Sequence, residues 1–226
     1  NIFIISLVFF LSLSLFIAYK TDFKFENTNT VSSEKLEKNK DADEEKEDKT
    51  QVKILAMGDM IFHQPIVKNY RTGESYDFTP IFANISEDIK GADIAIANFE
   101  GSVNSNRKLS GFPMFNFPKE SIYSLKNAGF DILSTANNHS LDTGLDGVAE
   151  TISHIKESGM ESFGTLAEEG EKGILIEKNG IKIGLISFTD TLNGMDSLMR
   201  NKEYSVNTFS QDFAGDIKNL KEKSDI

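Results

Sequence analysis

The distribution of hydrophobic and polar residues divides the chain into three parts. Apolar residues run almost unbroken from Ile2 to Tyr19, interrupted only by serines, and a charged segment with few apolar residues follows. From Gln51 onward, short apolar runs alternate with stretches of helical spacing, which is typical of a parallel sheet with right-handed crossovers. We therefore expect three regions, at 1–20, 21–50 and 51–226, of which the last is a folded α/β domain.

The alternating part of the chain predicts individual elements. Apolar runs predict strands at Val52–Met57, Asp93–Ala97 and Phe130–Thr135. Apolar residues at helical spacing predict helices at Pro80–Lys90, Lys119–Asn127, Leu145–Glu157 and Asp212–Lys223. The runs Gly173–Glu177 and Ile181–Phe188 predict a β-hairpin, because the Asn179-Gly180 pair between them favours a type I′ turn.

The first two regions are predicted to connect the domain to a membrane. The run Ile2–Tyr19 has the length of a short transmembrane helix. No small-residue cleavage site follows it, and Tyr19-Lys20 is typical of an interfacial anchor. We expect an uncleaved, single-pass signal anchor in the cell membrane with the C-terminal domain outside the cytoplasm; a cleaved signal peptide is the alternative. Segment 21–50 is predicted to be a disordered linker, because it has too little apolar surface to offset the entropy of ordering.

Composition limits the classes of function. The chain has 226 residues, of which 39% are hydrophobic, and this suffices for one good-sized domain plus appendages. It has no cysteine, which excludes disulfides, thiol nucleophiles and cysteine zinc sites. The net charge of -11 argues against nucleic-acid binding. It also disfavours binding of a polyanion unless a metal or a local Lys/Arg cluster supplies positive charge.

Side chains with metal-ligand chemistry follow each of the three predicted strands. Gly58-Asp59 follows the first strand, Asn98-Phe99-Glu100 the second and Asn138-His139 the third. Ligands collect at the carboxyl ends of strands in an open α/β sheet. We therefore expect the side chains of Asp59, Glu100 and His139 to converge within about 8 Å, since one or two metals must fit between them. Alternation along an extended chain places Asn98 and Glu100 on the same side.

These residue types suit a metal-dependent reaction. The carboxylates of Asp59 and Glu100 and the amide oxygen of Asn138 are ligands for a divalent cation. The imidazole of His139 can act as a ligand or as a general acid. Asp142, three residues on, can orient that imidazole through a hydrogen bond.

Each motif also has a purely structural interpretation. Asp59 can cap a loop, Asn98 can close its strand in an Asx turn, and the Asn137-Asn138 pair can cap a helix. His63 could reach the same region, but its position favours a solvated loop histidine. His154 is interpreted as an ordinary histidine on a helix surface.

Taken together, Gly58-Asp59, Asn98-Phe99-Glu100-Gly101 and Ala136–Asp142 resemble the CapA-type capsule-synthesis proteins, which are linked to poly-γ-glutamate capsule biosynthesis. That family is in turn similar to the calcineurin-like metallophosphatases. The resemblance runs from about Val52 to about Gly194. It implies a metallophosphatase-like β-sandwich flanked by helices, of which this chain would carry the N-terminal portion, incomplete at its C-terminus.

The resemblance also implies roles for the strand-end residues. Asp59 and Asn138 would bind metal, and Glu100 would bridge two metals. His139, with Asp142, would be catalytic. The implied cofactor is a divalent metal, either Mn, Zn or Fe.

Two departures from the phosphatase pattern leave the activity open. Ile61 stands where the first phosphatase motif has a histidine, and the later histidines of that pattern would lie beyond Ile226. We therefore expect this fragment alone to be inactive. One hypothesis is a membrane-anchored, metal-dependent hydrolase or phosphoesterase, and the other is a non-catalytic component that binds or helps to export the polymer. A site that has decayed is a third option. The expected partners are the capsule-synthesis membrane machinery and an anionic polymer, with no nucleic acid.

Overall fold

The computed structural model describes residues 50–226. The predicted anchor Ile2–Tyr19 and the predicted linker, up to residue 49, lie outside the described residues. Within 50–226, no helix combines the length and the hydropathy that crossing a membrane would require.

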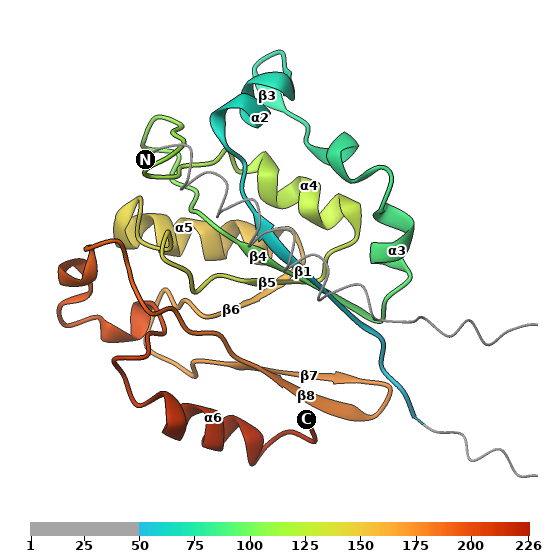
Figure 1. Ribbon diagram of the computed structural model, residues 1–226, viewed down its shortest axis with the longest axis vertical. Helices are drawn as coiled ribbons and strands as arrows, with labels where there is room; N and C mark the ends of the chain where they lie inside the picture. Colours follow the sequence, from blue (N-terminus) through green and yellow to red (C-terminus); the bar gives the residue numbers. More distant parts are fainter. Residues whose placement is uncertain (1–49) are drawn as a thin grey trace, which may run out of the picture. The chain divides into compact units, whose positions relative to one another are not determined.

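Four parallel strands form the central sheet, in the order β1-β4-β5-β6 (Figure 1). Their bounds are β1 Ile54–Met60, β4 Ile94–Phe99, β5 Ile132–Ser134 and β6 Glu161–Phe163. Each strand pairs with the next strand of the sheet in parallel, and a crossover segment containing at least one helix joins each pair. The protein is therefore a mixed α/β protein with a parallel sheet and flanking helices, as the sequence predicts.

The remaining elements surround this sheet. The helices are α2 Gln64–Asn69, α3 Ser86–Lys90, α4 Glu120–Ala128, α5 Gly144–Glu157 and α6 Phe213–Lys221. Short 3-10 helices are η1 Thr79–Phe82, η2 Asp196–Met199 and η3 Glu203–Ser205. Two antiparallel pairs complete the set: β2 Arg71–Thr72 with β3 Ser75–Tyr76, and β7 Ile174–Lys178 with β8 Ile181–Leu185.

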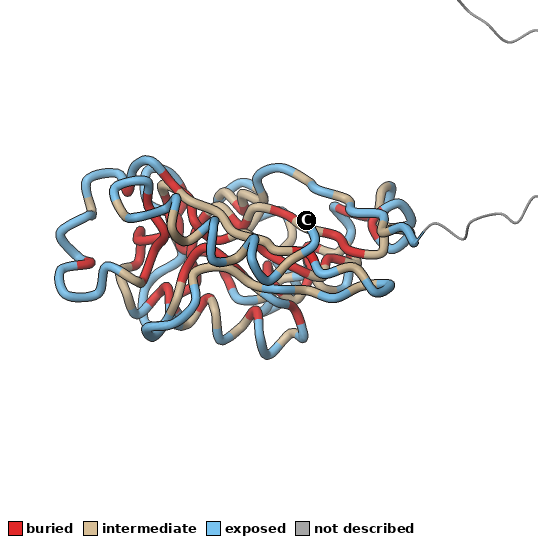
Figure 2. Tube along the Cα trace, turned by 90° about the horizontal axis from the view of Figure 1, so that it is seen from below, coloured by how far each residue is buried: buried red, intermediate tan, exposed pale blue. Residues whose placement is uncertain are grey.

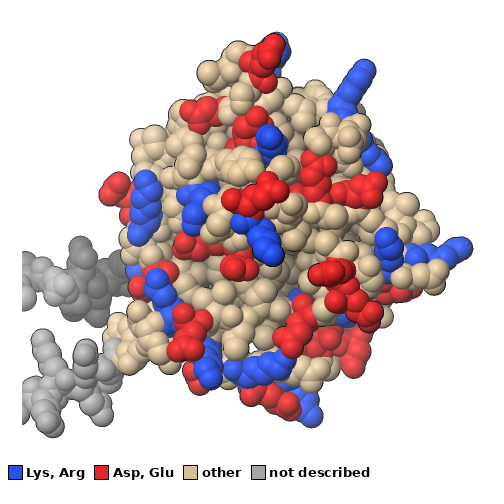
Figure 3. All heavy atoms as spheres, turned by 180° about the vertical axis from the view of Figure 1, so that it is seen from behind, with Lys and Arg blue, Asp and Glu red and all other residues tan. Residues whose placement is uncertain are grey.

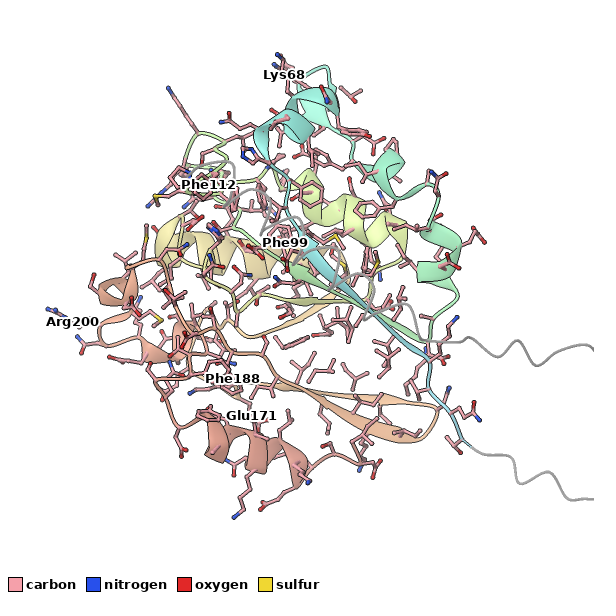
Figure 4. All side chains as sticks on the ribbon, in the orientation of Figure 1. Lys68, Phe99, Phe112, Glu171, Phe188 and Arg200 are labelled. Atoms are coloured by element: carbon pink, nitrogen blue, oxygen red, sulfur yellow. The ribbon has the colours of Figure 1, made fainter. Side chains whose placement is uncertain are left out.

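The main core lies between the sheet and α4 and is rich in phenylalanine. Phe99, labelled in Figure 4, is fully buried in the middle of the fold. Its ring packs edge-on against that of Phe117, with centroids 5.8 Å apart. Ile122 and Leu125 of α4 are fully buried in the same cluster. Figure 2 shows the buried segments passing through the interior with exposed loops around them. Aromatic rings that bury large apolar areas therefore supply much of this core.

The opposite face of the sheet is covered by the β7–β8 hairpin. Ile94, Ile132 and Phe163 of the sheet form a buried cluster with Ile183 of the hairpin. At the hairpin turn, Asn179 and Gly180 have φ of 51° and 76°, and positive φ at both residues defines the predicted type I′ turn. The local turn chemistry was therefore sufficient to identify this hairpin.

One predicted helix is wrong. The segment Pro80–Lys90 is divided between η1 and α3, with a turn at Ala83–Ile85 between them. The amide of Ile85 donates to the carbonyl of Phe82, a tighter bond than an α-helix makes. This break leaves Phe82 and Ile89 both buried in the main core. Tertiary packing therefore outweighed the helical periodicity of the segment.

Candidate strand-end site

The first two strand ends are joined directly by side-chain hydrogen bonds. β1 continues through Gly58 and Asp59, with a register shift between Met57 and Asp59, and places Asp59 opposite Asn98 of β4. The amide nitrogen of Asn98 donates to Asp59 Oδ1 at 2.8 Å and to Glu100 Oε2 at 3.3 Å. The side chain of Asn98 thus holds the two carboxylates together.

Asn137 connects the third strand end to this pair. Its buried side chain donates to the Phe99 carbonyl at 2.9 Å and to Asn98 Oδ1 at 3.3 Å. Its Oδ1 accepts the backbone N–H of His139 at 3.0 Å. Ser140 fastens the turn further, because its hydroxyl donates to the carbonyl oxygens of Thr135 and Asn137 at 2.7 Å. Asn137 therefore positions the turn that carries His139 against the end of β4.

His139 and Asp142 form a buried pair. Nδ1 of His139 lies 2.7 Å from Asp142 Oδ2, and both residues are buried. The backbone N–H of Phe115 also donates to Asp142 Oδ2. Within residues 50–226 no hydrogen bond engages Nε2 of His139. An ionised Asp142 accepts a hydrogen bond from Nδ1–H of the neutral ring. The other nitrogen, Nε2, is then the basic one.

Asn138 points to a different neighbour from Asn137. Its amide nitrogen donates to Asn193 Oδ1 at 3.4 Å, and the Asn193 amide nitrogen lies 3.5 Å from Nδ1 of His139. Asn193 follows β8 and has a φ of 54°, a conformation that asparagine tolerates better than most residues. Asn193 is thus a site residue that the sequence analysis did not single out, although the resemblance extended across it.

Burial changes the acidity of two carboxyl groups. Partial burial raises the pKa of Glu100, and the neighbouring charge of Asp59 raises it further, while His139 acts in the opposite direction. Burial also raises the pKa of Asp142, against the lowering effects of the Phe115 N–H and of His139. Glu100 and Asp142 are therefore the carboxyl groups of the site whose protonation the fold alters.

His63 is more enclosed than a solvated loop histidine. It caps the N-terminus of α2, where its Nδ1 accepts the N–H of Gln64 at 2.7 Å. A Cβ on Gly111 would lie 2.6 Å from the His63 ring, so only glycine permits this approach. The ring of Phe115 lies 5.9 Å from that of His63 and 4.4 Å from that of His139, between centroids. Phe115 therefore neighbours both histidine rings.

His154 also differs from the prediction of an ordinary surface residue. Its side chain is 14% exposed, and its ring nitrogens lie 3.6 Å from Glu150 and 3.1 Å from Glu157. The hydroxyl of Tyr123 on α4 lies 3.3 Å from its Nδ1. The hydroxyl of Ser153, together with His154 and Tyr123, lowers the pKa of Glu157. His154 thus belongs to a polar contact between α4 and α5, away from the strand ends.

The donors at the strand ends suit a hard cation better than zinc. Asp59 and Glu100 offer carboxylate oxygens and Asn138 an amide oxygen, which are the donors that Mg²⁺ and Mn²⁺ prefer. Within residues 50–226, no three or more His, Asp or Glu side chains are arranged so that they could hold a metal ion. A cation site at these strand ends therefore stays a prediction.

The arrangement defines a class: an α/β protein whose polar site lies at the carboxyl ends of neighbouring parallel strands. Within that class, the chain belongs to the bacterial capsule synthesis protein PGA_cap family, whose model matches residues 53–226. This confirms the resemblance that the strand-end motifs indicated.

Individual relatives are similar over part of their length. The chain is 29% identical to the capsule biosynthesis protein CapA of Bacillus anthracis over 158 residues, which is 67% of this chain and 36% of that protein. It is 29% identical to the PGA biosynthesis protein CapA of Bacillus subtilis over 116 residues, 49% of this chain and 30% of that protein. An uncharacterized protein of Sinorhizobium fredii is 27% identical over 151 residues, 63% of this chain and 31% of that protein. The chain thus spans about a third of the length of these curated relatives.

Proposed function

We propose that this protein acts in the synthesis of a bacterial capsule polymer, poly-γ-glutamate, and that the strand-end site is its working centre. Membership of the capsule synthesis family supports the process, and the names of the two Bacillus relatives agree with it. The observation that most strongly supports this site is the buried His139–Asp142 pair. Asn137 and Asn98 connect it by hydrogen bonds to the carboxylates of Asp59 and Glu100.

The side chains suit proton transfer beside a bound cation. A divalent cation held by Asp59, Glu100 and Asn138 would polarise a phosphoryl or carbonyl oxygen of the substrate. His139 takes or returns a proton at Nε2, because Asp142 holds the Nδ1 proton and stabilises the charged ring. Asn98 keeps the Asp59 and Glu100 carboxylates in place. The reaction class is therefore hydrolysis or transfer at a phosphoester or an amide-linked polymer.

The packing of the hairpin supports the predicted metallophosphatase-like β-sandwich. A metallophosphatase-like sandwich has a second β-layer against the first sheet, and β7–β8 packs on the central sheet through Ile183. We propose that this contact is the beginning of such a sandwich. Ile61 is half-buried against the main core, so it fills space where the phosphatase pattern has a histidine ligand.

The test of the site measures metal binding and activity separately. The whole protein, including any residues that follow Ile226, is purified in detergent and stripped of metal. It is then titrated with Mn²⁺ by calorimetry and assayed with a chromogenic phosphodiester. We expect Asn138→Ala to weaken Mn²⁺ binding by about tenfold. We expect His139→Ala to lower the rate by about a hundredfold or more with Mn²⁺ binding retained, because the general acid or base is lost.

The matched control is His154→Ala, which removes a histidine from α5 outside the site and should change neither quantity. A whole protein without substitutions that binds no Mn²⁺ and has no activity would overturn the catalytic proposal. Polymer binding by such a chain would then favour the second candidate function, a non-catalytic component of assembly or export.

We also propose that Ile2–Tyr19 anchors the protein in the cell membrane, with residues 51–226 outside the cytoplasm. The length and hydropathy of that run support the anchor. The protein expressed in cells should fractionate with membranes at full length. A shortened form in the soluble fraction would show that the run is a cleaved signal peptide.

A further inference from the structure

Two segments of the folded domain carry basic residues and no acidic ones. Residues 60–73 and 101–119 contain no Asp or Glu, and together they carry five basic residues: Lys68, Arg71, Arg107, Lys108 and Lys119. The rest of 51–226 carries 12 basic and 25 acidic residues. An acidic domain thus has two carboxylate-free segments, which would create a local positive field if they lie together.

The fold brings these two segments together around one groove. The groove has a volume of about 750 Å³ and, apart from Tyr76, is lined only by residues of the two segments. Lys68 and Arg71 contribute charge, and Pro65, Val67 and Leu109 contribute apolar surface. Figure 4 shows Lys68 projecting outward on α2. We call this feature the basic groove.

The far wall of the basic groove is held rigidly by one buried side chain. The amide nitrogen of Asn116 donates to the carbonyl oxygens of Asn104, Arg107 and Lys108, at 3.0, 3.2 and 3.1 Å. Its Oδ1 accepts the N–H of Asn104 at 2.8 Å. The loop that carries Arg107, Lys108 and Leu109 is therefore fixed before any ligand binds, which lowers the entropic cost of binding.

The cations of the groove are not neutralised within the domain. Among residues 50–226, neither Lys68 nor Arg71, the two cations that line the groove, makes an ion pair. The face shown in Figure 3 has blue and red side chains intermixed, as is usual for a soluble surface. Lys68 and Arg71 are therefore available to pair with the carboxylates of a ligand.

The basic groove adjoins the strand-end site. His63 lines the groove, and the Phe115 ring neighbours the rings of both His63 and His139. A chain lying in the groove would thus have one end close to His139.

We propose that the basic groove binds an aliphatic polymer that carries carboxylates, and presents it to the strand-end site. Lys68 and Arg71 would pair with successive carboxylates, and methylene groups would pack on Pro65, Val67 and Leu109. The identification of the polymer as γ-linked polyglutamate rests on the proposed function; the groove itself rests on charge and shape. A γ-linked glutamate chain has both features, because each unit carries one carboxylate and two methylene groups.

The test is a binding titration with a fluorescent γ-linked glutamate oligomer, followed by anisotropy on the full chain at low salt. The double variant Lys68→Ala/Arg71→Ala removes two groove cations three residues apart. Its matched control is Lys218→Ala/Lys221→Ala, which removes two exposed cations three residues apart on α6. We expect the groove variant to bind about tenfold more weakly, since each exposed charge pair contributes a factor of up to about five, and the control to change affinity less than twofold.

Two outcomes would overturn the proposal. Equal losses in the two variants would show that only net charge matters. The second outcome is that a polyphosphate of matched charge binds as tightly as the glutamate oligomer and loses this binding in Lys68→Ala/Arg71→Ala. The groove would then attract any polyanion and would not recognise an aliphatic carboxylate chain.

The His139→Ala variant separates this proposal from the proposed function. Suppose that the wild type binds no metal and has no activity, and that both the wild type and His139→Ala bind the oligomer. The groove proposal would then hold although the catalytic proposal fails. Metal binding and His139-dependent activity without oligomer binding would have the opposite meaning.

Discussion

Gly164 supports the turn that carries the site residues, and replacing it should destabilise the protein. Gly164 follows β6 with a φ of 105°. A Cβ added there would lie 2.6 Å from the backbone nitrogen of Ala136 and would also contact the Ser187 hydroxyl. Ala136 begins the turn that leads to Asn137 and His139, so Gly164→Ala presses on the backbone of the site.

The expected cost has two parts. Forcing an L-residue into a left-handed conformation costs about 1–2 kcal/mol, and inserting a methyl group into a packed site costs about 1–3 kcal/mol more. The free energy of unfolding should therefore fall by about 2–5 kcal/mol, a large fraction of the stability of an ordinary domain. Gly159→Ala is the control, because Gly159 has a φ of 80° but no atom within 4 Å of the added Cβ. It should incur only the conformational cost.

The assay is urea unfolding of the full chain and both variants, followed by circular dichroism. We expect Gly164→Ala to be less stable than Gly159→Ala by about 1–3 kcal/mol, the packing contribution alone. Equal stability of the two variants would refute the reasoning, because it would show that Ala136 and Ser187 yield to the methyl group at no cost.

Two further predictions concern residues that hold the site and the groove. Burial raises the pKa of Asp142, so its contribution to stability is fully present below its unfolded pKa of about 3.9 and is lost as pH rises through the folded value. The stability of wild type relative to Asp142→Asn, measured by urea unfolding at successive pH values, should therefore fall as pH increases through that window; a rise would contradict the burial argument. Asn116→Ala removes a buried side chain that makes four hydrogen bonds and should lower the free energy of unfolding by about 2–4 kcal/mol. It should also weaken oligomer binding in the anisotropy titration, and unchanged binding would show that the loop needs no such support.

The sequence by itself determined the features that depend on neighbouring residues. The hairpin turn at Asn179-Gly180 was predictable because two residues with positive φ select that chemistry. Helix α5 begins at Gly144, one residue before the predicted start, and ends at Glu157 as predicted. Its apolar spacing marks the helix, and Ser158-Gly159 marks its end. Polar residues after apolar runs likewise marked the C-terminal parts of the three strands, although β1 continues to Met60 and β4 to Phe99. The metal-binding and catalytic roles of those residues stay predictions.

Only the tertiary structure decided how distant residues meet. No local pattern indicates that Asn98 holds Asp59 beside Glu100, or that Asn193 reaches Asn138 across 55 positions of sequence. The three residues of β6 are too few for a periodic signal. The basic groove is formed by segments 60–73 and 101–119, and the sequence alone shows that both lack carboxylates. It does not show that they are neighbours, because only the pairing of β1 with β4 brings them together. Local propensity acts over a few residues, whereas a site at strand ends is assembled by register, crossover and packing between segments far apart in the chain.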